Sequence, residues 1–168
     1  MPKIQEISGR EILDSRGRPT VEATCILASG SRAVASVPSG ASTGKAEAVE
    51  LRDGAPQRYK GLGCRQAARN VSGELNERVS GRDFALHADF DRLLIACDGT
   101  PAKSRLGANA LVAASVAFAC STAAERRVRY GDTSRRSPAR RPTPSHDSLS
   151  IFSAAANTPA SRWRFRTS

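Results

Sequence analysis

A loop of small residues carries the residue types best suited to chemistry in this chain, and it reads VPSGASTG over residues 37–44. Its two glycines have no side chain, so the backbone can come close to a ligand. Ser39, Ser42 and Thr43 add hydroxyl groups and free backbone amides, which suit an anion or a hard metal ion. The composition of the loop therefore predicts work on a charged ligand.

One alternative for this loop is a nucleotide-binding P-loop, because residues 40–45 read GASTGK. The loop is one residue too short between its glycines, and Ala46 stands where Ser or Thr follows the lysine of a P-loop. A P-loop also follows a parallel strand, whereas the strands expected here are antiparallel. We therefore exclude nucleotide binding of this type.

Three segments before the loop have the composition of half-buried strands. Residues 3–12, 20–27 and 32–37 carry β-branched and apolar side chains in partial alternation with polar ones. Turn-forming residues separate the segments, and Pro38 ends the third. The pattern predicts a three-stranded antiparallel meander that leads directly into the loop.

Helices are expected after the loop. Apolar residues at helical spacing predict a short helix over 46–52, a longer one over 62–79, and a third that carries Phe90, Leu93, Leu94 and Cys97. A final helix over 108–125 is apolar nearly all round, so it should be the most buried. It falls short of the roughly 20 strongly apolar residues of a membrane span. Sheet first and helical bundle after is an α+β arrangement.

The cysteines and histidines show no pattern of a metal or disulfide site. The four cysteines are widely spaced without a C-x-x-C pair, and neither His87 nor His146 is spaced with them as a ligand. We expect buried thiols in a reducing compartment. The amino-terminus has no apolar core of a signal peptide, so we expect a soluble cytoplasmic protein.

Four motifs in one order resemble the amino-terminal domain of enolase. They are GREILDSRG at 9–17, the loop at 37–44, EAVELRDG at 47–54 and DGTPAKSRLGANA at 98–110. The resemblance covers residues 3–125. It implies the family's α+β domain and its reaction, in which Mg²⁺-dependent removal of water converts 2-phosphoglycerate to phosphoenolpyruvate.

The resemblance also implies roles for individual residues. The loop residues Ser39, Gly40, Ala41, Ser42 and Thr43 match a mobile lid, and Ser42 matches a ligand of the second, catalytic Mg²⁺. Arg10 and Glu22 match residues in ion pairs across the family's homodimer, and Arg16 sits in the same turn motif. Lys103 and Arg105 are expected to hold the 98–109 connection rather than to bind a ligand.

The family's other catalytic groups have no matching positions in this sequence. The lysine base, the acidic helper, the carboxylates that hold the first Mg²⁺ and the phosphate-binding groups lie on a carboxy-terminal barrel in that family. We therefore expect these 168 residues to be inactive alone. Most family partners of the dimer residues are on the barrel too, so we do not expect the family's dimer from this chain.

Residues 126–168 differ from residues 1–125 and are expected to form a separate, disordered tail. They hold ten arginines, no lysine and two aspartates, which gives +8 of the total net charge of +10. Such a tail could bind nucleic acid or an acidic partner. The preferred interpretation is a shifted reading frame, because regrouped codons for residues 150–168 permit NILSGGKHAG, which resembles a later enolase stretch. A third hypothesis is a split enzyme completed by a separate barrel.

Overall fold

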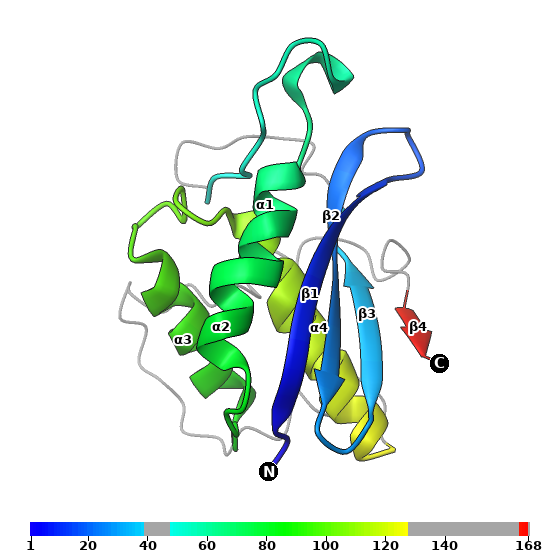
Figure 1. Cartoon of the computed structure of the whole chain (residues 1–168), viewed down its shortest axis with the longest axis vertical. Helices are drawn as coiled ribbons and strands as arrows, with labels where there is room; N and C mark the ends of the chain where they lie inside the picture. Colours follow the sequence, from blue (N-terminus) through cyan, green and yellow to red (C-terminus); the bar gives the residue numbers. More distant parts are fainter. Residues whose placement is uncertain (39–47, 128–164, 168) are drawn as a thin grey trace, which may run out of the picture.

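The computed structural model describes residues 1–38, 48–127 and 165–167. Its sheet contains β1 (Ile4–Leu13), β2 (Pro19–Leu27), β3 (Arg32–Ser36) and a short β4 (Phe165–Thr167), in that spatial order and all antiparallel. The first three strands form the expected meander (Figure 1). The fourth is a finding that the sequence did not predict, because three residues of the expected disordered tail pair with β3.

The helices follow the meander and cover one face of the sheet (Figure 1). α1 (Arg65–Asn70), the π-helical segment η2 (Val71–Leu75) and α2 (Asn76–Val79) follow one another without a break, after a short 3-10 turn, η1 (Tyr59–Gly61). α3 (His87–Asp98) and α4 (Ala108–Glu125) complete the set. The sheet and the helices confirm the predicted α+β fold.

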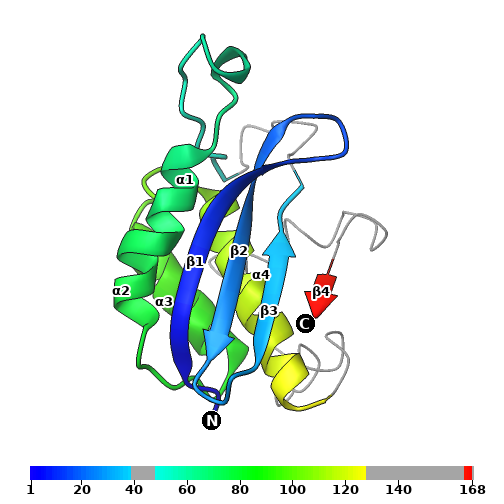
Figure 2. The same ribbon diagram turned by 45° about the vertical axis from the view of Figure 1, so that its right-hand side comes forward.

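The core lies between the sheet and α4, which packs along β2 and β3 (Figure 2). Alternate residues of β2 and β3 face it, and Val21, Ala23, Cys25, Ala33 and Ala35 are all buried. α4 is long and apolar enough to cross a membrane, but about 78% of it is buried inside the fold. The expected buried helix is therefore confirmed.

Helix side chains cover the outer edge of β1. The backbone N–H of Ile7 donates to Asn76 Oδ1 at 2.8 Å, and that of Gly9 donates to Ser72 Oγ at 2.8 Å. The Ser72 hydroxyl in turn donates to the carbonyl oxygen of Gly9 at 3.1 Å. The backbone groups at this edge are therefore satisfied by the helical segment 65–79.

The prediction of a helix over 46–52 is wrong for the part that the structure describes, because residues 48–52 are not helical. The N–H of Val49 donates to the carbonyl of Ala102, and the N–H of Ala108 donates to the carbonyl of Val49. Asn109 pairs with both backbone groups of Leu51, at 3.2 and 3.1 Å. These backbone groups are bonded to a distant segment, so they are not available for helical i to i−4 bonds.

Candidate functional site

The predicted lid residues, 39–43 with the metal ligand Ser42, lie outside the described residues, but both ends of their loop are anchored. On the β3 side, Val37 donates its N–H to the carbonyl of Val21 at 3.0 Å and accepts a hydrogen bond from the Thr20 hydroxyl. On the other side, Val49 is bonded to Ala102 and Ala108. The fold therefore fixes where the loop leaves the sheet and where it rejoins the domain.

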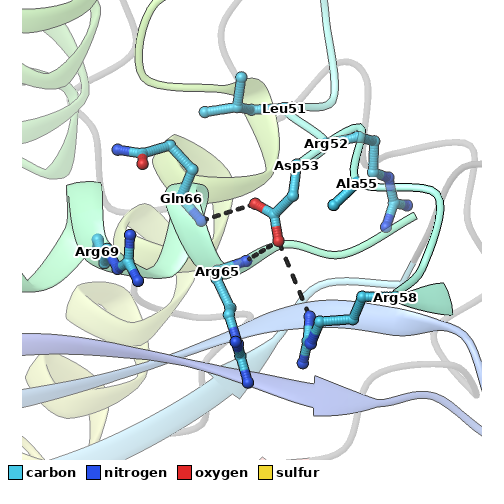
Figure 3. Close-up of a pocket in the computed structure, with 8 residues that line it drawn as sticks. All are labelled: Leu51, Arg52, Asp53, Ala55, Arg58, Arg65, Gln66 and Arg69. Atoms are coloured by element: carbon cyan, nitrogen blue, oxygen red, sulfur yellow. Dashed lines mark hydrogen bonds and ion pairs between the residues drawn. The ribbon is translucent and has the colours of Figure 1, made fainter. Parts of the chain in front are cut away.

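A pocket of about 360 Å³ opens beside the segment that follows the loop (Figure 3). Four arginines and one aspartate give it a polar lining. The lining residues are Leu51, Arg52, Asp53, Ala55, Arg58, Arg65, Gln66 and Arg69. The sequence did not single this pocket out, although Leu51, Arg52 and Asp53 belong to the EAVELRDG motif.

Asp53 holds the start of α1 at this pocket. Its carboxylate accepts the backbone N–H of Arg65 at 3.0 Å and that of Gln66 at 2.9 Å, as Figure 3 shows. It also lies 3.8 Å from the guanidinium of Arg58. Asp53 thus accepts hydrogen bonds from amides that would otherwise be unbonded at the start of the helix. Its negative charge also interacts favourably with the positive end of the helix dipole.

Glu11 ties the same region to the sheet. Its carboxylate pairs with both terminal nitrogens of Arg58, one of them at 2.8 Å, and accepts the backbone N–H of Cys64 at 2.5 Å. The bond from Arg58 holds the pKa of Glu11 below its ordinary value, against the opposing effect of burial, and the Cys64 amide adds to the lowering.

Arg52, another arginine of the pocket lining, is also bonded within the fold. Arg52 donates to the carbonyl oxygens of Pro19 and Leu62, each at 2.8 Å, and pairs with Glu50 at 2.7 Å. Glu11, Asp53, Arg52 and Arg58 therefore hold residues 50–66 against β1 and β2. The pocket is a structural junction, and its charges are largely used by the fold.

Replacing Glu11 with glutamine should loosen this junction. The neutral glutamine side chain cannot form the ionic pair with Arg58, and it accepts a weaker hydrogen bond from the backbone N–H of Cys64. We therefore expect the backbone N–H of Cys64 to exchange with solvent roughly tenfold faster. Glu6→Gln, on the exposed part of the same strand, is the matched control and should leave Cys64 unchanged. Equal exchange rates at Cys64 in both variants would contradict the role of Glu11.

The 98–109 connection is held as the sequence predicted. Lys103 Nζ donates to the carbonyls of Thr100 and Pro101 at 3.1 and 3.2 Å. Arg105 donates to the carbonyl of Asp98 at 3.1 Å and pairs with both carboxylate oxygens of Glu74 at 2.7 Å. That pairing lowers the pKa of Glu74. Both cations thus bind the chain itself.

His87 has partners in the fold that the sequence did not identify. Its Nε2 lies 3.0 Å from Ser115 Oγ and 3.3 Å from Asp91 Oδ1, and Ser115 donates to Asp91 at 2.7 Å. The ring also stacks on Phe118. Ser115 is completely buried, so no substrate can reach its hydroxyl, and the cluster joins α3 to α4. His146 lies outside the described residues.

The i to i+4 spacing of His87 and Asp91 was the available signal for this cluster. Its third member could not be identified from spacing. Ser115 belongs to another helix, and it approaches only because α3 and α4 pack together.

Arg10 and Glu22, the predicted dimer residues, lie directly opposite each other on β1 and β2. They form an ion pair at 2.5 Å within the chain, and Ser36 donates to the second oxygen of Glu22 at 3.1 Å. Arg10 is largely exposed. A contact to another subunit remains a prediction. Arg16 lies in the turn after β1, where its N–H donates to Asp14.

The cysteines are free thiols, and Cys25, Cys64 and Cys120 are buried as expected, while Cys97 is half-buried. Burial raises the pKa of Cys25 and of Cys120 to about 12 and that of Cys64 to about 11. A thiol with such a raised pKa is protonated at neutral pH and is therefore a poor nucleophile.

The described residues do not fit a magnesium site. Within 1–38, 48–127 and 165–167, no group of three or more His, Cys, Asp or Glu side chains lies close enough together to hold a metal ion. Among the described residues that follow the loop, Glu50 and Asp53 are acidic, and both are paired as described above. Mg²⁺ needs several oxygen ligands in near-octahedral geometry, so one loop serine cannot hold it.

A comparison with protein families identifies a related family. A family model described as "Enolase, N-terminal domain" matches residues 4–130. The matched range contains the meander, the loop and every helix that the structure describes, and it leaves out β4. It agrees with the range of the resemblance seen in the four motifs.

Proposed function

Because the chain belongs to the family of enolase amino-terminal domains, we propose that it serves as the amino-terminal domain of a Mg²⁺-dependent lyase. The proposed reaction converts 2-phosphoglycerate to phosphoenolpyruvate and water. The family match over residues 4–130 carries the proposal. The anchored ends of the 37–44 loop support it, since a lid closes about fixed ends. A cytoplasmic location goes with this proposal.

In the proposed function, the chain supplies a lid and one ligand. Residues 39–43 close over the substrate, and the Ser42 hydroxyl reaches the catalytic Mg²⁺. The described residues do not form a metal site, so the ion has to be held mainly by carboxylates of a barrel domain. The proton-abstracting base has to come from the same place. These 168 residues alone should therefore be inactive, and a barrel domain has to complete them.

Mixing the full chain with a separately prepared enolase barrel tests this proposal. We expect no dehydration of 2-phosphoglycerate by either component alone and Mg²⁺-dependent formation of phosphoenolpyruvate by the mixture, followed by ultraviolet absorbance. Ser42→Ala should lower the rate of the mixture by about 10²-fold or more, as loss of a group that stabilises transition-state charge does. Ser29→Ala, in the exposed turn before β3, is the matched control.

A mixture that binds but shows no activity with Mg²⁺ would refute the proposed role of the domain. Activity that Ser42→Ala leaves unchanged would refute only the role of Ser42. The shifted reading frame of residues 126–168 also stays a proposal, supported by their arginine-rich composition and by the permitted codon regrouping.

A further inference from the structure

The two edges of the sheet are protected in different ways. At β1, side chains of the helical segment 65–79 take up the outward-facing backbone groups of Ile7 and Gly9. Lys3 is bridged to Asp83 at the start of the same edge. A second strand cannot pair there without displacing the helix. The β1 edge is therefore closed by the fold itself.

The outer edge of β3 has no such helix cover in the described structure. Val37 donates its N–H to Val21 of β2, and backbone direction alternates along a strand, so Ala35 and Ala33 also face β2. The N–H and C=O groups of Arg32, Val34 and Ser36 consequently face outward. Arg32 is the one charged residue of β3, and no proline interrupts the strand. These are features of an edge that accepts another strand.

In this chain β4 occupies that edge. Figure 2 shows β4 beside β3. Val34 lies opposite Arg166, with Ala33 opposite Thr167 and Ala35 opposite Phe165. Because the backbone of Val34 faces outward, Val34 and Arg166 form the hydrogen-bonded pair of this short ladder, and the backbone of Thr167 faces away from β3. The contact has only three residues, so a longer strand can compete with it.

β3 is complementary to a second copy of itself. In a two-fold antiparallel arrangement centred on Val34, the two Val34 residues lie opposite each other, and Arg32 lies opposite Ser36 of the second copy. No like charges meet, and a pair of β-branched residues stabilises the centre. α4 packs on one face of the sheet and does not cover the outer edge of β3, where β4 is paired (Figure 2).

We propose that the outer edge of β3 is a strand-binding site for a second copy of this chain, and that β4 occupies the site in the monomer. The two copies pair through β3 and join their sheets into one. The inference goes beyond the proposed function and holds for the chain as its sequence stands, whatever the origin of residues 126–168.

Proline substitutions in the full chain test this inference. Arg166→Pro removes the N–H that β4 donates to Val34, so we expect β4 to leave and the chain to dimerise, with a Kd at least tenfold lower than that of the unaltered chain in sedimentation velocity. Thr167→Pro is the matched control, because its N–H does not face β3. Arg166→Ala controls for the lost charge. Both controls should remain monomeric where Arg166→Pro is dimeric.

Adding Val34→Pro to Arg166→Pro should restore the monomer, since it removes the outward N–H of β3 and leaves the bonds to β2 in place. Protected β2 amides in hydrogen exchange show that each variant is folded. A folded Arg166→Pro variant that stays monomeric would overturn the inference. So would association that Val34→Pro does not reverse, which would indicate another surface, or equal association of the Thr167→Pro control.

Discussion

Replacing Gly9 with alanine is expected to lower the free energy of unfolding by about 2 to 3 kcal/mol, the upper part of the range for overpacking. A Cβ at this position would lie 2.6 Å from the carbonyl oxygen of Ala68 and 2.7 Å from Cβ of Val71. Both atoms belong to the helical backbone or its first side-chain carbon, so neither can rotate away. The helical segment 65–79 has to move off β1.

That movement would also break the bonds that close the β1 edge. Gly9 exchanges two hydrogen bonds with Ser72, and both need the helix close to the strand. The π-helical turn Val71–Leu75 lies at this contact, where it presents Ser72 to the edge. A π-helical turn is a rare element, and here it accompanies a close approach of helix and strand.

Gly73 provides the matched control for Gly9. It lies in the same helical segment, and a Cβ there meets nothing within 4 Å. Gly73→Ala should therefore raise the free energy of unfolding by up to about 1 kcal/mol, because alanine loses less backbone entropy in a helix. Urea denaturation of the two variants measures both values. Two changes of the same sign would show that the approach at Gly9 is not tight.

The sequence was sufficient for elements whose signal is local. Alternation in residues 20–27 and 32–37, with turn formers between them, predicted β2 and β3 to within one residue. The uniform apolar character of 108–125 predicted α4 and its burial. In these segments, the residues that fix the structure are neighbours along the chain, so periodicity alone identifies them.

The features that the sequence did not predict are contacts between distant parts of the chain. Residues 48–52 contain good helix formers, but Leu51 is bonded to Asn109, which is 58 positions away. Ser115 reaches His87 only through the packing of two helices. The pairing of Arg10 with Glu22 depends on the register of β1 and β2. Composition and spacing do not encode such contacts, because tertiary packing decides them.

The candidate site also has one part that could be predicted from the sequence and one part that could not. The 37–44 loop could be identified because its residues form one motif. The junction of Glu11, Asp53 and Arg58 could not, since its members come from a strand and two later segments. Local motifs therefore show which residues can do chemistry, and only the fold shows which charges are already paired.

The second large effect is expected at Asp98, which is 2% exposed and ends α3. Its carboxylate accepts the buried N–H of Leu106 at 2.7 Å, the N–H of Thr100 at 3.0 Å and the Thr100 hydroxyl. Asp98→Ala leaves these donors without a partner, so we expect the free energy of unfolding to fall by about 3 kcal/mol. Asp98→Asn keeps one acceptor oxygen and should lose about half as much.

The pH dependence of stability distinguishes the effect of the charge of Asp98 from the effect of its shape. Burial alone would raise the pKa of Asp98, but hydrogen bonds from Thr100 and Leu106 hold it below the ordinary value of 3.8. The charge of Asp98 therefore contributes its full stability at a pH above the ordinary pKa. This stability is lost as the pH falls through the lower pKa that Asp98 has in the fold. Between about pH 5 and pH 2, the unaltered chain should lose more stability than Asp98→Asn.

Glu11 and Glu74 also have lowered pKa values, and Asp98→Asn retains both. The difference between the two pH profiles, measured by urea denaturation, thus isolates Asp98. Parallel profiles would mean that its charge does not stabilise the fold. A convergence at low pH would show that the Asp98 carboxylate adds stability to the 98–109 connection, which Lys103 and Arg105 also hold. Because Val49 and Leu51 are bonded to that connection, acid would then release the downstream anchor of the 37–44 loop before the sheet unfolds.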